Sequence, residues 1–269
     1  MLLMADAGIL RLAARREAGR IGHMTRLASG ALVAAAVLFA SFVRAQPPSP
    51  GQAGAPATRE ADPGVFTTPV LDRAEVRASR LEVKPGGTRR VHQHDDVQFH
   101  LFIPVSGSIR LTRNGEAIDA VVGQVYFLDK GTPHTFTNAG TTSASAVEVF
   151  VKARELAPVA GAQPPSPAAA RTSEVDPGVF NTSPILDRAE MRAGRVEVRP
   201  GGTRRLHQHN EVQFHLFIPI AGSVRMTMNG ETIDCAVGQV YFIGKGTPHT
   251  FTNAGTSNAT AVEVFVKPR

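Results

Sequence analysis

The chain has little cysteine and tyrosine, and these absences exclude several kinds of site. Its 269 residues include one cysteine, Cys235, and two tyrosines, Tyr126 and Tyr241. A single cysteine cannot close a disulfide within the chain. Both tyrosines stand in apolar segments, where core or rim residues are expected rather than catalytic groups. Segments with the apolar period of an amphipathic helix are also missing, which indicates an all-β fold.

The chain has an excess of basic residues, but this excess does not indicate a nucleic-acid partner. The formal net charge is +6 at pH 7. Residues 1–45 contain six arginines against Asp6 and Glu17, so most of the excess lies in this segment. A basic patch on the folded part is therefore not expected, and nucleic acid is excluded as a predicted partner.

The same N-terminal segment has the parts of a secretory signal peptide. An apolar run, Ala31–Val43, follows a short basic start at Met24, and the small residue Ala45 offers a cleavage site. The run is too short to span a bilayer comfortably, although an uncleaved membrane anchor is the rival interpretation. We therefore predict a periplasmic or secreted protein that meets the membrane only through its signal peptide during export.

An internal repeat organises the rest of the chain. Asp62–Lys152 and Asp176–Lys267 are near-copies, and most differences exchange one aliphatic residue for another. A segment rich in Pro, Ala, Gly and Ser precedes each copy. The predicted organisation is a signal peptide at 1–45, a disordered linker at 46–61, a first domain at 62–152, a Pro/Ala-rich linker at 153–174 and a second domain at 175–269.

Each copy contains short β-rich segments separated by turn residues. In the first copy the β-rich segments are Arg80–Lys84, Ser108–Thr112 and Gln124–Leu128, and the turns are Pro-Gly-Gly at 85–87, Asn-Gly at 114–115 and Lys-Gly-Thr-Pro at 130–133. Asn-Gly is the strongest hairpin signal, because both central residues of the favoured turn need positive φ. The pattern predicts one small β-barrel or sandwich in each copy.

Eight of the nine histidines fall into two matching sets, and only His23 lies outside them. The sets are His92, His94, His100 and His134, and His207, His209, His215 and His249. Imidazole is the commonest side-chain ligand for a transition metal. Residues two apart on a strand project from one face, and a closed site needs ligands from distant parts of the chain. We therefore predict one divalent transition metal in each copy, held by these eight histidines.

Glycines and an asparagine complete a recognisable pattern around the histidines. The residues are Gly86, His92, His94, Gly107, Gly123, Gly131, His134 and Asn138, with copies at Gly201, His207, His209, Gly222, Gly238, Gly246, His249 and Asn253. They resemble the two signature motifs of the cupin superfamily, whose small β-barrels hold a metal in their mouth. The resemblance implies a bicupin with two tandem jelly-roll barrels of the double-stranded β-helix type. It does not identify the reaction, because the family spans dioxygenases, decarboxylases, isomerases, storage proteins and ligand-binding regulators.

The glutamate that is usual in the first of these motifs is missing. Counting from the two ends of the motif gives either Gln98 or His100, and in the second copy Gln213 or His215. The two candidates have the same parity along a strand, so either can face a metal. We favour His100 and His215 as fourth ligands, because imidazole binds transition metals better than a carboxamide does.

A shell of four imidazoles suits iron(II), manganese(II), copper(II), nickel(II) and zinc(II). An octahedral ion in such a shell keeps positions for a small-molecule substrate or dioxygen. The leading hypothesis is therefore an exported metal-dependent oxidoreductase of dioxygenase type. The alternatives are a non-catalytic cupin that binds a metal or small ligand, and a metal-dependent isomerase or lyase. The two barrels are expected to pair within the chain or between chains as a homo-oligomer.

One arginine pair stands just before the histidines of each copy. The pairs are Arg89–Arg90 and Arg204–Arg205. Exposed arginine is the common case, so solvated loop charges are the first expectation. Beside a metal, such an arginine can instead hold an anionic substrate by a bidentate contact.

Overall fold

The computed structural model describes residues 57–152 and 169–268. The predicted signal peptide and most of the two predicted linkers lie outside these ranges. Within them the chain forms strands, turns and bends, and it has no helix. The described residues accordingly offer no helix that could cross a membrane. The prediction of an all-β fold is confirmed.

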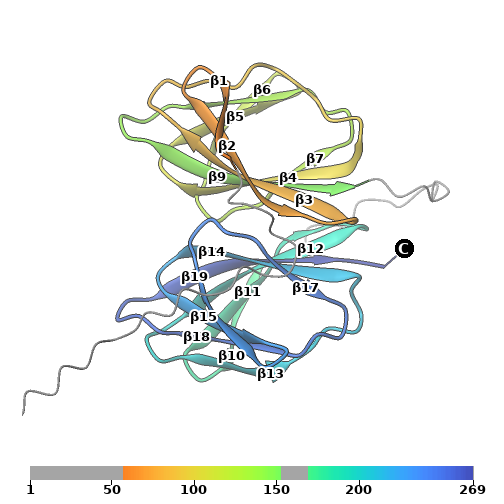
Figure 1. Cartoon of the computed structure of the whole chain (residues 1–269), viewed down its shortest axis with the longest axis vertical. Coiled ribbons are helices and arrows are strands. Elements are labelled where there is room, and N and C mark those ends of the chain that lie inside the picture. Colours follow the sequence, from red (N-terminus) through yellow and green to blue (C-terminus); the bar gives the residue numbers. More distant parts are fainter. Residues whose placement is uncertain (1–56, 153–168, 269) are drawn as a thin grey trace, which may run out of the picture. The chain divides into compact units, whose positions relative to one another are not determined.

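The first repeat folds into two sheets (Figure 1). The larger sheet has the order β1-β2-β3-β9-β4-β7, with β1 (Arg59–Asp62), β2 (Val65–Asp72), β3 (Val76–Val83), β9 (Ala144–Lys152), β4 (Val97–Ser106) and β7 (Tyr126–Asp129). The smaller sheet has the order β6-β5-β8, with β6 (Glu116–Ala120), β5 (Ile109–Arg113) and β8 (His134–Asn138). The last strand, β9, therefore lies between β3 and β4.

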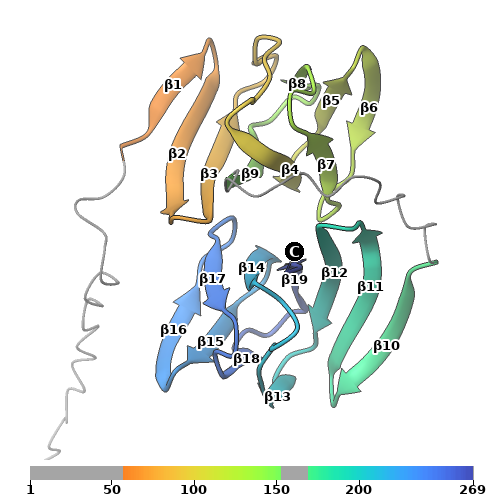
Figure 2. The same ribbon diagram turned by 90° about the vertical axis from the view of Figure 1, so that its right-hand side faces the viewer.

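The second repeat has the same strand order in its larger sheet and one additional strand, β13, in its smaller sheet (Figure 2). Its larger sheet contains β10 (Arg171–Asp176), β11 (Val179–Asp187), β12 (Met191–Val198), β19 (Ala259–Val266), β14 (Phe214–Ala221) and β17 (Tyr241–Gly244). Its smaller sheet contains β13 (Thr203–His207), β18 (His249–Asn253), β15 (Val224–Met228) and β16 (Glu231–Cys235). The structure is consistent with the predicted tandem jelly-roll barrels.

The Asn-Gly turn joins β5 and β6 as predicted. Their register runs from Ile109 opposite Ala120 to Arg113 opposite Glu116. Asn114 and Gly115 both adopt positive φ, at 49° and 82°, and the second repeat has 51° and 84° at the equivalent turn. These are the dihedral signs that a tight hairpin turn with the strand twist requires.

One motif glycine is required by close packing as well as by its backbone angle. Gly107 turns the chain between β4 and β5 with a φ of 76°. A Cβ atom there would lie 2.6 Å from the Cβ of Ala144, closer than such atoms approach in folded proteins. This glycine of the first motif therefore has a structural role.

The central strands β4 and β9 are buried on both faces. On one face Phe102 and Phe136 belong to the interior core of the first barrel, with ring centroids 5.2 Å apart. On the other face Phe99 stacks on Phe127 at 4.9 Å, in an apolar cluster whose residues come from both repeats. Phe99 and Phe127 lie on the outer face of the barrel, because residues of opposite parity on a strand project to opposite sides.

Each barrel begins earlier than composition predicted. The first starts at β1 rather than at Asp62, and the second starts at β10 rather than at residue 175. Arg59 pairs with Thr67, and the hydroxyls of Thr58 and Thr68 lie 2.7 Å apart. These edge strands have exposed polar side chains and are held through their backbones, so they carry no apolar period.

The arginine pairs are engaged with a carboxylate of the same repeat. Asp62, only 6% exposed, accepts hydrogen bonds from the Arg89 guanidinium and, at 3.2 Å, from the backbone N–H of Arg90. Burial alone would raise the pKa of Asp62, but the two arginines hold it below its usual value. Asp176 makes the same contacts with Arg204 and Arg205. The pairs thus fasten the first strand to the segment that leads to the histidines.

Replacing Asp62 by alanine tests this fastening. The change leaves two arginines without their shared partner, and we expect a loss of about 1–3 kcal/mol in the free energy of unfolding. Asp119→Ala, which removes an exposed ion pair with Arg110, is the control and should have no measurable effect. Urea unfolding followed by circular dichroism measures both. Equal midpoints for Asp62→Ala and the native protein would contradict the assignment.

Candidate metal centre

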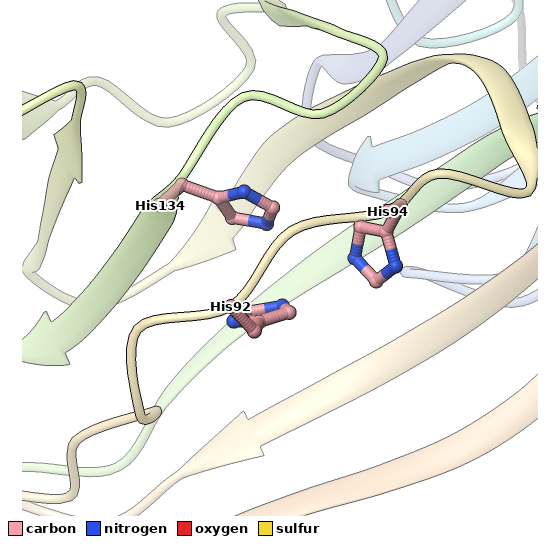
Figure 3. Close-up of side chains that lie close together, drawn as sticks. All are labelled: His92, His94 and His134. Atoms are coloured by element: carbon pink, nitrogen blue, oxygen red, sulfur yellow. The ribbon is translucent and has the colours of Figure 1, made fainter.

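The first and second motifs meet through backbone hydrogen bonds between two histidines. The N–H of His92 donates to the carbonyl of His134 at 3.0 Å, and the N–H of His134 donates to the carbonyl of His92 at 2.9 Å. Their ring centroids are 4.2 Å apart, and that of His94 lies 5.4 Å from His134. Figure 3 shows the three side chains gathered around a common space.

The local structure of the His-x-His segment differs from the strand that was expected. His92 makes only an isolated bridge, and His94 lies in the loop that follows. In the second repeat β13 ends at His207, and His209 comes after it. The chain leaves the sheet here, yet the two rings remain 5.0 Å apart in the first repeat. The two histidine rings are therefore brought together by the pairing of His92 with β8 rather than by a regular strand.

Three histidines of each repeat bring their ligand atoms together. The nitrogens of His92, His94 and His134 all lie within 4.8 Å of one another. His207, His209 and His249 form the same group in the second repeat. Each repeat therefore holds a group of side chains that could bind one metal ion.

Backbone carbonyls fix which nitrogen these rings present. Nδ1 of His92 lies 2.9 Å from the carbonyl of Arg90, and Nδ1 of His134 lies 2.8 Å from that of Thr132. A carbonyl only accepts, so Nδ1 carries the hydrogen and Nε2 keeps its lone pair. His207 and His249 make the same bonds at 2.8 and 2.9 Å. Metal-binding histidines are commonly oriented in this way.

The free nitrogens are buried and remain neutral. Nε2 of His94, His134, His209 and His249 has no hydrogen-bond partner. Burial, which penalises the charged ring, lowers the pKa of His94 and of His134 to about 4. Burial also lowers the pKa of His207 to about 4. Unpartnered, uncharged imidazole nitrogens aimed at one point fit a divalent transition metal.

His100 adjoins this group from β4. It is 1% exposed, and its ring centroid lies 5.1 Å from that of His94 and 5.0 Å from that of His134. The ring of Phe150 stacks on it at 4.5 Å with an interplanar angle of 15°. Gln98, the competing candidate, stands two residues earlier on β4 and is half-buried. Ligation by His100 or Gln98 stays a prediction.

His215 has the same place in the second repeat. Its ring lies 5.2 Å from His209 and 5.4 Å from His249, and it stacks on Phe265 at 4.4 Å. Gln213 is likewise half-buried. The four histidines of each predicted set are therefore neighbours, with three ligand atoms in one tight group and the fourth ring against its edge.

A buried glutamate in each repeat was missed by the sequence reasoning. Glu148 on β9 and Glu263 on β19 are 7% and 5% exposed. Oε1 of Glu148 lies 3.4 Å from Nε2 of His100, and the matching distance from Glu263 to His215 is also 3.4 Å. Burial alone would raise the pKa of Glu148, but the neighbouring histidines hold it below its usual value. A lone acidic residue in an otherwise apolar strand was the available signal.

The two centres differ in one side chain. In the second repeat Nδ1 of His209 lies 3.2 Å from Oε1 of Glu211. Asp96 stands at the equivalent position of the first repeat, where it accepts a hydrogen bond from Arg77 at 2.6 Å. A carboxylate that orients a ring through Nδ1 strengthens the other nitrogen as a ligand. Only the second centre has this support for its middle histidine among the described contacts.

Other residues singled out in the sequence have structural roles. The Asn138 amide donates to the carbonyls of Val83 and Thr142 at 2.8 and 2.7 Å, which holds the end of β8 in place. The hydroxyl of Tyr126 accepts a hydrogen bond from the backbone N–H of Val121 at 2.8 Å. Tyr241 makes the same bond with Ala236. Each tyrosine hydroxyl thus holds a backbone N–H of its own repeat.

Comparisons with known proteins identify similar domains. The family model described as "Cupin domain" matches residues 79–150 and 194–265, which together make up more than half of the chain. Among curated sequences no match was found.

Several solved structures have the same fold. AerE from Microcystis aeruginosa is 12% identical with a TM-score of 0.64, covering 79% of this chain and 97% of its own. The oxalate decarboxylase of Lactobacillus farciminis, in a formate complex, is 18% identical with a TM-score of 0.62, covering 80% and 84%. The oxalate decarboxylase of Bacillus subtilis, described with Mn(II) centres, is 17% identical with a TM-score of 0.61, covering 80% and 76%.

The lowered histidine pKa values predict how stability depends on pH. Between about pH 6.5 and pH 4 the unfolded chain takes up protons on these histidines while the folded, metal-free protein does not. The free energy of unfolding should therefore fall as the pH is lowered through this window. Urea midpoints of the metal-free protein at several pH values measure the effect. A midpoint that stays constant from pH 7 to about 4.5 would show that the rings titrate normally.

Exchanging the two unequal carboxylates tests whether they set metal affinity. Glu211→Asp should weaken zinc binding at the second centre roughly 10-fold, because the shorter side chain no longer reaches His209. Asp96→Glu should strengthen binding at the first centre. Isothermal titration with zinc(II) at low salt resolves the two sites. Unchanged constants in both variants would mean that these carboxylates do not act on the ligands.

Proposed function

The chain belongs to the cupin family, and we propose that it is an exported, metal-dependent bicupin that acts as an oxidoreductase of dioxygenase type on a small molecule. One observation carries the proposal. In each repeat three uncharged imidazoles present their Nε2 atoms to one space, and nothing in the described residues pairs with the buried ones. Such a face of three neutral ligands leaves an octahedral ion with open positions on its other side.

The residues around this face are suited to hold a metal in a fixed place. His92, His94 and His134 would be its ligands in the first barrel, with His207, His209 and His249 in the second. His100 and His215 would be the fourth ligands. A bound ion would supply a Lewis acid and a binding position for substrate or dioxygen. The carbonyls of Arg90 and Thr132 keep two rings oriented, so the ligand set is arranged before an ion arrives.

Apolar side chains support the same centre from inside the barrel. Phe150 contacts His100 face to face and His94 edge to face, at centroid distances of 4.5 and 4.7 Å. The layer beneath contains Phe102, Phe136 and Leu128. Such a wall excludes water from one side of the centre, so that substrate would approach from the open side. An excluded, low-dielectric environment strengthens the interactions of polar groups within it.

A decarboxylase like the structural neighbours is supported less well. Those neighbours are 17–18% identical to this chain, a level at which the likeness concerns the fold alone. The first motif here has His100 or Gln98 where the family usually has a glutamate, so its carboxylate is missing from that position. The lyase alternative therefore lacks the side chain that the resemblance would assign to it.

A non-catalytic binding protein is the second candidate, because a closed histidine site alone needs no reaction. The two functions differ in the open positions of the ion. A binding protein would fill them with further protein ligands and leave no position for a substrate. An enzyme would leave exchangeable water there. Export is part of both proposals and rests on the basic start, apolar run and small residue of the leader.

Metal content tests the ligand assignment. We expect the mature protein, purified from its native compartment, to hold about one transition-metal ion in each barrel. His92→Ala should empty the first barrel and His207→Ala the second, so each variant keeps the other centre as its internal control. Elemental analysis by mass spectrometry measures the loss. If both variants retained the native metal content, the ligands would be wrongly assigned.

Oxygen uptake tests the reaction class. With its native metal the protein should consume dioxygen in the presence of one member of a panel of diketones, catechols and thiols. The His92→Ala/His207→Ala double variant should consume none above background, because it lacks a ligand in each centre. An oxygen electrode measures the rate. A redox-inactive metal with no exchangeable water, and no uptake with any member of the panel, would favour the binding protein.

A further inference from the structure

The buried glutamates of the last strands stand in an unusual environment. β9 is apolar around Glu148, and its neighbours Val147 and Val149 are fully buried on the other face. Taking an ionised carboxylate out of water costs several kcal/mol unless a partner of opposite charge or a hydrogen bond compensates it. Burying Glu148 inside the barrel therefore costs free energy, and the same holds for Glu263 on β19.

Strand register aims Glu148 at the histidine cluster. In the pairing of β4 with β9, Phe102 stands opposite Glu148 and His100 stands opposite Phe150. Glu148 and His100 are thus diagonal neighbours on the same, inward face of the sheet. Ligand atoms of His100, His134 and Glu148 lie within 4.8 Å of one another. The carboxylate consequently adjoins the three-histidine group through His134, which belongs to both sets.

The contacts of this carboxylate are incomplete among the described residues. Oε1 of Glu148 and both ring nitrogens of His100 are buried and have no partner that meets hydrogen-bond geometry. They face each other at 3.4 Å, and the stacked ring of Phe150 holds His100 flat. In the second repeat the distance from Glu263 to His215 and the stacking on Phe265 are nearly the same. Neither glutamate is explained by packing.

We propose that Glu148 and Glu263 are positioning residues of the two metal centres, each accepting a hydrogen bond from the fourth histidine and supplying the negative charge that a ligand set of imidazoles lacks. The inference rests on the proposed metal centres. A divalent ion among neutral imidazoles leaves two positive charges in a largely buried site. A carboxylate that contacts the fourth histidine partly compensates this charge, and it orients the ring of His100 or His215 toward the ion.

In this arrangement the acidic group of the centre comes from a different part of the chain than the first motif. The first motif offers His100 or Gln98 where a glutamate is usual, while Glu148 comes from the last strand, β9. The carboxylate then acts through His100 instead of taking the position of a motif ligand. The centre keeps four histidines and still has one acidic group within reach.

Zinc(II) binding by the Glu148→Gln variant tests the proposal. The full mature chain is titrated with zinc(II), without any substrate. Glutamine has nearly the same shape but no charge. The dissociation constant of the first centre should rise about 10–100-fold, while the second centre keeps its native affinity. Glu263→Gln should give the mirror result. Glu82→Gln on β3, which affects an exposed ion pair with Lys84, is the matched control and should change neither centre.

Stability of the metal-free protein separates this role from a purely structural one. Positioning predicts that any change in the metal-free urea midpoint of Glu148→Gln is accompanied by weaker zinc binding at the first centre, because the carboxylate acts on the ring that faces the ion. A lower midpoint together with native zinc affinity would overturn the proposal. If Glu148→Gln does not fold, Glu148→Asp takes its place, because aspartate keeps the charge but places the carboxylate farther from His100. Native zinc affinity in that variant would overturn the proposal equally. Failure of the native protein to bind zinc would remove both the metal centres and this inference.

Discussion

The backbone pairing of His92 with His134 is the constraint on which the centre depends. Two hydrogen bonds join residues that are far apart in the sequence and set their rings 4.2 Å apart. The second repeat pairs His207 with His249 at the end of β13, after a register shift that follows Arg204. Because the segment before β4 is tied to β8 in this way, the neighbouring His94 is carried to the same place. The site thus depends on the sheet pairing of His92 with His134 and on the loop that holds His94 beside them.

Around this pairing, one face of the central strands builds the apolar core and the other face carries the polar residues of the site. Residues of one parity on β4 and β9 build the apolar cluster that includes Phe99 and Phe127. Those of the other parity bring His100, Glu148 and Phe150 inside. The outer face supplies burial, and the inner face can therefore carry polar groups that are costly to bury. Holding neutral imidazoles and one carboxylate in such an interior favours an ion that satisfies both.

Much of this was predictable from the sequence, and the remainder has physical reasons. The repeat, the Asn114–Gly115 hairpin and the histidine sets follow from local patterns, because turn chemistry and ligand type are properties of single residues. Glu148 was not predictable in this way, since its meaning depends on which strand lies beside β9. The edge strand β1 was also missed, because exposed strands held by backbone bonds resemble a linker in composition.

The central claim is that three imidazoles of each barrel converge on one ion. X-ray diffraction from crystals of the metal-loaded protein, collected at the absorption edge of the bound metal, tests it most directly. The account predicts one anomalous peak in each barrel, about 2.0–2.2 Å from Nε2 of His92, His94 and His134 and likewise from Nε2 of His207, His209 and His249. A peak bound through other residues, or no peak within either barrel, would contradict it.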